Sequence, residues 1–248
     1  MKWTIAACQG PLSAWPEGRA ARARWLSSRG AREAADPLQG MVEQDAALLR
    51  AARQGETLVF WCESDCYDLA DLAAAVAFVM QAEPEARLEL ILLDDHPEVT
   101  DFHGLVQLSP AQLVECFVER SLLRRAQVDA LIHCWEALCA GPAACAEVGT
   151  QSLPIPFLAA AMERLGQEAP DADGFGLTER RLVHAAQEQA RTASRLYRAA
   201  QQEERRPWLG DSMVYAMIDE LAGRGRPPIR VASPGAVRSG GEALVEAC

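Results

Sequence analysis

The sequence lacks any long hydrophobic run and has too little positive charge to bind nucleic acid over its whole surface. Charged residues or Gln repeatedly interrupt the apolar stretches of its 248 residues, and none approaches the roughly 18 apolar residues of a membrane helix. The formal net charge is −11, whereas neutralising phosphates requires a basic surface. We therefore expect no membrane partner, and DNA binding only through a local basic region.

Several motifs of common enzyme classes are also missing. The sequence contains no Gly-rich phosphate loop, no nucleophile elbow and no HExxH helix. Its eight cysteines are scattered through apparent helices and strands, unlike the dense cysteines of a short secreted disulfide scaffold. We therefore expect reduced thiols and a cytoplasmic protein.

A zinc site is not expected, because zinc ligands usually occur in pairs at close spacing such as CxxC. The residues that would have to form one do not follow such a spacing: Cys62, Cys66, His133, Cys134, Cys139 and Cys145.

The clearest organised stretch is a strand, a helix and a strand. The apolar run at 57–62 predicts a strand buried on both faces, Leu69 to Gln81 predicts a very apolar helix, and Leu88 to Leu93 predicts a second strand. This order implies a right-handed parallel crossover. We therefore predict an α/β domain with a small parallel, Rossmann-like sheet and helical cover.

Both predicted strands end in acidic residues, and ligands of open α/β sheets bind outside the carboxyl ends of the strands. The predicted crevice has catalytic candidates Glu63, Asp65, Asp68 and His103, and ligand-binding candidates Trp61, Asp94, Asp95 and His96. Clustered carboxylates are hard oxygen ligands, so Asp65 and Asp68 are the candidates to bind Mg²⁺; any other cofactor is unknown. In the alternative interpretation, Glu63, Asp65 and Asp68 cap the following helix and interact favourably with the positive end of its dipole.

The remainder of the chain is predicted to be mostly helical and to divide in two. Helices are expected at 110–119, 126–140 and 154–166, and the α/β domain is expected to span 1–170. A linker at 171–176 precedes a module at 177–232, and the tail at 233–248 is expected to be disordered. Three helices opened by Thr178, Thr192 and Asp211, followed by an edge strand, resemble a winged helix-turn-helix.

The predicted module differs in charge from the rest of the chain. From Gly176 to Gly240, eleven Arg and seven acidic residues give +4, while the rest carries 13 basic and 28 acidic residues, or −15. The candidates to contact a nucleic-acid backbone are Arg191, Arg195, Arg198, Arg205 and Arg206. The third helix contains Asp211, Asp219 and Glu220, which would repel DNA, so DNA is not the favoured partner.

Six stretches of the chain together resemble the bacterial protein family known as domain of unknown function 1835. The likeness is carried by Gln-Gly-Pro-Leu at 9–12, Val-Phe-Trp-Cys-Glu-Ser-Asp-Cys-Tyr-Asp at 59–68, Phe-His-Gly-Leu-Val-Gln-Leu-Ser-Pro-Ala-Gln-Leu at 102–113, Leu-Pro-Ile-Pro-Phe-Leu at 153–158, Gly-Leu-Thr-Glu-Arg at 176–180 and Trp-Leu-Gly-Asp at 208–211. The resemblance spans nearly the whole chain and implies no established activity. It departs from the family where the first strand is lacking and where Glu63-Ser64-Asp65 replaces a Glu-His-Asp turn.

The sequence leads to one main functional hypothesis and two alternatives. The main one is a ligand-binding or regulatory α/β protein with an acidic crevice at the strand ends, whose partner is a small molecule or a protein. The first alternative is a metal-dependent enzyme acting on a nucleotide-like or phosphorylated molecule. The second is a DNA-binding or transcription-factor-associated protein that acts through the C-terminal module.

Overall fold

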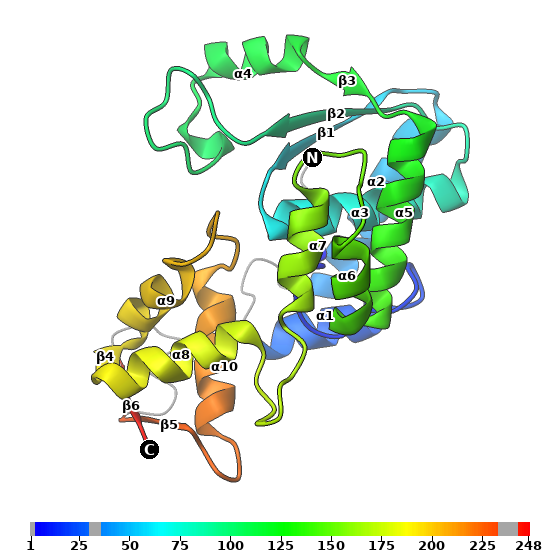
Figure 1. Cartoon of the computed structure of the whole chain (residues 1–248). Helices are drawn as coiled ribbons and strands as arrows, with labels where there is room; N and C mark the ends of the chain where they lie inside the picture. The colour runs from blue at the N-terminus through cyan, green and yellow to red at the C-terminus, as the bar shows by residue number, and fades with distance from the viewer. Residues whose placement is uncertain (1–2, 30–35, 233–242) are drawn as a thin grey trace. The chain divides into compact units, whose positions relative to one another are not determined.

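The computed structural model describes residues 3–29, 36–232 and 243–248 and shows a mixed α/β protein, as predicted (Figure 1). The chain divides into two compact units. The first comprises Met1–Arg24 and Asp36–Gly166, and the second comprises Trp25–Ala35 and Gln167–Cys248. Each unit has its own sheet and its own buried core.

The first unit is built on a parallel pair of strands. β1 (Leu58–Glu63) pairs with β2 (Leu88–Leu93) in register from Leu58 opposite Leu88, and α3 (Cys66–Ala82) connects them. The two-residue strand β3 (Ser121–Leu122) adds to β2 in the antiparallel direction. The predicted strand–helix–strand unit is therefore present, and β1 is an edge strand of this sheet.

Helix α3 is buried on nearly every side. Twelve of its 17 residues are buried, and they include the unbroken run from Leu69 to Val79. The helix begins after Asp65, whose side chain caps it. Helix α3 contacts β1, α2, α5 and α7, so it lies at the centre of the unit rather than on its surface.

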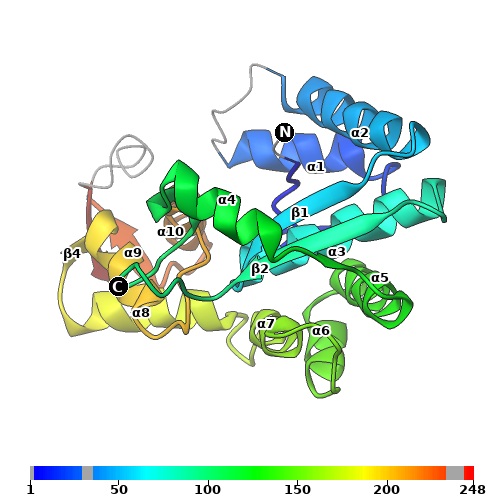
Figure 2. The same ribbon diagram turned by 90° about the horizontal axis from the view of Figure 1, so that it is seen from above.

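The opposite face of the strand pair is covered by 3₁₀-helix η1 (Leu105–Gln107) and α4 (Pro110–Val118). In Figures 1 and 2, α4 and α3 lie on opposite faces of β1 and β2. Between α4 and the sheet lies a small apolar cluster of Ile91, Phe102, Leu108 and Cys116. Helix α4 begins where the sequence predicts it, because Ser109 and Gln112 form a capping box.

Three further helices complete the unit: α5 (Arg125–Ala140), α6 (Pro142–Gly149) and α7 (Leu158–Gly166). Helix α6 was not predicted, because its sequence is rich in small residues and has no clear apolar period. Helices α6 and α7 approach each other very closely. A Cβ atom at Gly149 would lie 2.4 Å from the backbone N of Glu163, and one at Gly166 would lie 2.6 Å from the Cα of Ala146.

The N-terminal segment is held by side chains rather than by strand pairing. The carboxylate of Asp71 in α3 accepts hydrogen bonds from the backbone N of Ala7 (2.8 Å) and of Ile5 (3.4 Å). Arg22 in α1 (Arg19–Ser28) donates to the carbonyl oxygens of Ile5 (2.7 Å) and Ala6. Polar groups of the segment are therefore bonded inside the protein, as buried polar groups require.

A second buried carboxylate ties this segment to α2 (Pro37–Arg53). Asp45 in α2 accepts from the indole Nε1 atoms of Trp3 (2.8 Å) and Trp15 (3.0 Å) and from Nε of Arg19 (2.9 Å). One acidic side chain thus joins three parts of the chain.

The second unit combines three helices with a three-stranded antiparallel sheet of order β4-β6-β5. Its elements are α8 (Leu177–Glu188), β4 (Arg191–Thr192), α9 (Ala193–Gln201), α10 (Asp211–Ala222), β5 (Ile229–Val231) and β6 (Leu244–Ala247). Helix α10 is central to this unit, because Val214 to Ile218 are all buried.

Two expectations about the domain boundaries differ in detail from the structure. The division between units follows Gly166 rather than residue 170, and Trp25–Ala35 group with the second unit. The expected linker at 171–176 is an ordered turn, because the Asp171 carboxylate accepts from the backbone N of Asp173 (2.9 Å) and of Phe175 (3.0 Å).

The expected disorder of the tail is also wrong in part. Residues 233–242 lie outside the described residues, but β6 pairs with both β4 and β5. Strand β6 has four residues, and only Val245 among them is fully buried. An alternating pattern with a single buried position is too short to predict a strand. Across the described ranges, no helix is long and apolar enough to cross a membrane.

The close approach of α6 and α7 gives a stability prediction. Gly149→Ala and Gly166→Ala should each lower the free energy of unfolding by about 1–3 kcal/mol, because the added methyl group meets backbone atoms that cannot move aside. Gly40→Ala, inside α2 with no atom within 4 Å of the new Cβ, should instead raise it by up to about 1 kcal/mol. Urea unfolding measures all three, and equal effects would contradict the packing explanation.

Candidate functional site

The acidic turn after β1 is held by hydrogen bonds within the protein. Oδ1 of Asp65 accepts from the backbone N of Asp68 (2.9 Å), and Oδ2 of Asp68 accepts from the backbone N of Glu63 (2.8 Å). Oε1 of Glu63 accepts from the backbone N of Leu105 (2.7 Å), beside Gly104, where any Cβ would collide with that carboxylate. Of these three carboxylates, only that of Asp65 caps the following helix α3, as the alternative interpretation predicts; Asp68 bonds back to the end of β1, and Glu63 bonds to the start of η1.

The ends of β1 and β2 are also linked by a side-chain hydrogen bond. Ser64, which follows β1, donates from Oγ to Oδ1 of Asp94, which follows β2. The parallel pairing puts both carboxyl ends at one edge of the sheet, so the predicted meeting of the two acidic segments is present.

Five of the eight predicted crevice residues line two separate depressions, whereas Glu63, Asp65 and His103 line neither of them. The first, which we call the β1 groove, has a volume of about 480 Å³ and runs beside β1. It is lined by Trp3, Thr4, Leu48, Thr57, Leu58, Val59, Phe60, Trp61, Tyr67, Asp68, Asp71, Leu72 and Ala75. Of the predicted site residues, it contains only Trp61 and Asp68.

The second depression, which we call the β2 hollow, has a volume of about 590 Å³ and lies at the carboxyl end of β2. Its lining includes three predicted ligand-binding residues, Asp94, Asp95 and His96, together with Glu115 of α4 and Glu119, which follows that helix. Its apolar part is formed by the last residues of β2 and by the segment from Ile155 to Phe157. Both depressions are large enough for a small organic ligand, for which about 300–1,000 Å³ is typical.

His96 is the most buried of the predicted ligand-binding residues, with 9% of its surface exposed. Its Nδ1 accepts a hydrogen bond from the backbone N of Glu98 (3.3 Å), so in the neutral ring the proton is on Nε2. Among the described residues, Nε2 has no hydrogen-bond partner. His103, in contrast, is an exposed loop residue.

The β2 hollow also contains a strained backbone position. Phe157 has a φ of 65°, in the left-handed region that large side chains rarely adopt. Such strain is concentrated at ligand-binding and active sites, because it persists only where the surrounding structure imposes it. Phe157, Glu115 and Glu119 were not among the predicted site residues; the Pro-Ile-Pro-Phe segment was the available signal for Phe157.

Asp71 is a further missed residue, and it lies in the β1 groove. Tyr67 donates to Thr4 Oγ1 (2.8 Å), because the hydroxyl of Thr4 in turn donates to Oδ2 of Asp71. Burial raises the pKa of Asp71 to about 6, and burial raises the pKa of Asp65 to about 7. An acidic residue inside a helix that is otherwise apolar was the sequence signal for Asp71.

The predicted metal ligands do not form a metal-binding cluster. Within residues 3–29, 36–232 and 243–248, no three His, Cys, Asp or Glu side chains are grouped to bind a metal ion. Asp65 and Asp68 each use a carboxylate oxygen to accept from a backbone N–H.

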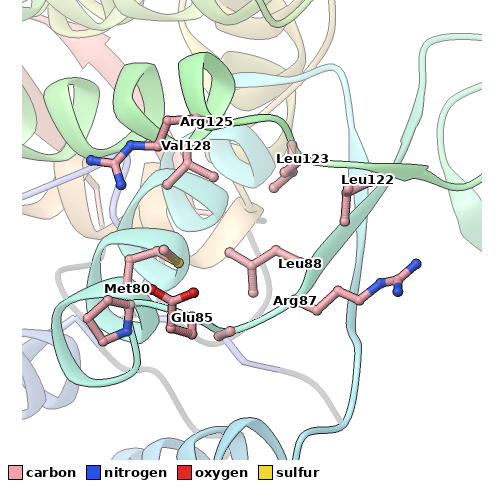
Figure 3. A pocket seen from close by; sticks show the side chains of 10 residues that line it. Met80, Glu85, Arg87, Leu88, Leu122, Leu123, Arg125 and Val128 are labelled. Atoms are coloured by element: carbon pink, nitrogen blue, oxygen red, sulfur yellow. The ribbon is translucent and has the colours of Figure 1, made fainter.

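A third depression, of about 470 Å³, lies at the opposite end of β2 and contains none of the predicted residues. Figure 3 shows Met80, Leu88 and Val128 projecting into it, while the guanidinium groups of Arg87 and Arg125 point away from its centre. It lies away from the carboxyl ends of the strands, where ligands of α/β sheets bind.

The arginines of the second unit are mostly engaged with acidic residues. Arg191 forms an ion pair with Glu188 (2.9 Å), and Arg181 forms ion pairs with Glu203 (3.1 Å) and Glu204 (2.5 Å). Arg195 and Arg198 are exposed on α9, while Arg205 is exposed and Arg206 half-buried in the turn that follows.

Comparison with protein-family models, curated proteins and solved structures finds no match to this chain.

The raised pKa of Asp65 predicts a pH dependence of stability. Between pH 4 and about 7 the folded state retains a proton that the unfolded state has lost, so this residue makes the protein less stable as the pH rises through that window. The free energy of unfolding of the native chain relative to Asp65→Asn should therefore fall by about 1–3 kcal/mol from pH 4 to pH 7.

The control for this measurement is Asp171→Asn. The pKa of Asp171 is lowered by hydrogen bonds from backbone N–H groups, so above about pH 5 it is ionised in both states and the difference should stay constant; toward pH 4 any change should have the opposite sign to that of Asp65. Urea unfolding at several pH values measures both differences. A difference for Asp65→Asn that does not change between pH 4 and 7 would contradict the prediction.

Proposed function

We propose that this chain is a ligand-binding protein whose β2 hollow accepts an organic cation. The observation that carries the proposal is the charge of the hollow: its lining includes Asp94, Asp95, Glu115 and Glu119, and no Lys or Arg is among the lining residues. Four carboxylates around one depression attract a positive group and repel a phosphate. This charge favours a cation over the nucleotide-like or phosphorylated ligand of the enzyme hypothesis.

The apolar part of the hollow supports an organic ligand rather than a bare ion. Leu92, Ile155 and Phe157 line the same depression as the carboxylates and are apolar. Small-molecule sites commonly combine such surface with a few placed polar groups. The Nε2–H group of His96 provides a hydrogen-bond donor, so the ligand should carry an acceptor as well as a cationic group.

We further propose that the first unit is a Rossmann-like domain and the second a winged-helix-like module, as the order of elements in the sequence predicts, and that the chain is a member of the family domain of unknown function 1835. The parallel β1–α3–β2 unit supports the Rossmann-like domain. The sheet order β4-β6-β5 after α8, with α10 preceding β5, supports the winged-helix-like module.

The proposed ligand class is tested with N-acetylarginine amide, which carries a guanidinium group and amide acceptors. Calorimetric titration of the full chain should show binding that is at least about tenfold tighter than that of N-acetylcitrulline amide, a neutral analogue of similar shape. Adenosine monophosphate, an anion, should not bind. Equal binding of the charged and neutral compounds, or binding of the nucleotide alone, would overturn the proposal.

A pair of variants locates the site. Glu115→Gln combined with Glu119→Gln should weaken binding by roughly tenfold, because two exposed carboxylates near a cation each contribute up to about 1 kcal/mol. Glu147→Gln on α6 removes an exposed carboxylate that does not line the hollow, so the affinity should stay the same.

DNA binding through the second unit remains the alternative, and the ion pairs of Arg181 and Arg191 do not favour it. Helix α10, which would read bases in a winged-helix module, has Asp211 and Glu220 on its exposed positions. We expect the full chain to show no retention on immobilised duplex DNA at low salt. Retention that weakens steeply as salt rises would support the DNA alternative.

A further inference from the structure

The outer edge of β1 carries unpaired backbone groups. In a parallel ladder, alternate residues of a strand bond to the neighbour on one side. The backbone N of Leu58 donates to the carbonyl of Arg87 (2.9 Å), so Leu58, Phe60 and Cys62 face β2. The N–H and C=O groups of Val59 and Trp61 therefore face the other way, where no described residue bonds to them.

These unpaired groups open into the β1 groove. The groove is lined by five consecutive residues, from Thr57 to Trp61, and also by Trp3 and Thr4 of the N-terminal segment. These two residues are fixed in place, because the indole of Trp3 donates to Asp45 and the hydroxyl of Thr4 donates to Asp71. The groove is thus bordered by a strand edge and by an anchored part of the N-terminal segment.

The dimensions and floor of the groove suit a strand. Thr57 and the first four residues of β1 extend over about 13 Å, at about 3.3 Å per residue, and the outward groups of Val59 and Trp61 repeat every second residue, as a strand partner requires. The floor is apolar where Leu48 of α2 and Leu72 and Ala75 of α3 line it. An occupying strand would place every second side chain on this floor.

The charge of the surrounding unit limits the occupant further. The first unit contains 11 basic and 22 acidic residues, a formal charge of −11. Asp68 lines the groove near the carboxyl end of β1. A segment rich in acidic residues would be repelled, so the occupant should be neutral or basic.

We propose that the β1 groove binds an extended, neutral or basic peptide segment of a partner protein, which adds as a strand to the outer edge of β1. Main-chain hydrogen bonds to Val59 and Trp61 supply much of the attraction in this mode of recognition, and the apolar floor selects alternate side chains. This interaction surface is separate from the cation site in the β2 hollow, so either proposal can fail without the other.

The test uses the full chain and an acetylated, amidated peptide, Lys-Val-Thr-Val-Thr-Val-Lys, at millimolar concentration. Amide hydrogen exchange is followed residue by residue by nuclear magnetic resonance. Without the peptide, the amides of Val59 and Trp61 should exchange at least about tenfold faster than those of Phe60 and Cys62, which bond to β2. With the peptide, Val59 and Trp61 should become protected.

Matched peptides and variants show whether strand pairing is responsible. Peptides with N-methyl groups on one set of alternate residues should lose binding, while methylation of the other set should leave it unchanged. Val59→Pro removes an outward N–H group and should abolish binding while β1 and β2 remain paired, because proline is tolerated at an edge position of this kind. Val59→Thr keeps the N–H group and should bind normally.

Three outcomes would overturn the proposal. One is protection of Val59 and Trp61 in the dilute chain without peptide. Another is protection that rises with protein concentration alone, which would identify a second copy of the chain as the occupant. The third is no change in exchange on adding the peptide. A thermal unfolding curve of Val59→Pro separates loss of binding from loss of the fold.

Discussion

Helix α3 imposes the main constraint on the first unit, because a helix that is apolar on nearly every side cannot leave any face in water. The run from Leu69 to Val79 is buried without interruption, and β1, α2, α5 and α7 all contact it. The sheet of the unit is too small to cover such a helix alone. The helical layers around α3 therefore follow from its composition as much as from the strands.

Asp71 is the polar exception inside this helix, and it explains how the N-terminal segment is positioned. A carboxylate in the interior needs hydrogen bonds, and Thr4, Ile5 and Ala7 supply them. Because the same segment brings Trp3 to Asp45, the two buried carboxylates together fix one wall of the β1 groove. The groove thus depends on the hydrogen bonds that the buried carboxylates of Asp71 and Asp45 accept.

The sequence predicted the strand–helix–strand unit because apolar runs of the right length alternate there, and it predicted α4 because the capping box at Ser109 is local. Of the three residues that it offered as caps of the following helix, Asp65 does cap it, whereas Asp68 and Glu63 bond to β1 and η1. It could not predict the contacts of Asp71, whose partners lie 64 to 67 residues away in the chain, or the pairing of β6 with β5. The separation of one expected crevice into two depressions depends on side-chain packing, which periodicity does not encode.

The hydrogen bond between Ser64 and Asp94 has a thermodynamic consequence. Asp94 lines the β2 hollow, Ser64 adjoins Glu63, and the backbone N of Glu63 bonds to Asp68, which lines the β1 groove. One short series of covalent and hydrogen bonds therefore joins the two depressions. If occupancy of one depression shifts this series, the affinity of the other changes, and reciprocity requires the same factor in both directions.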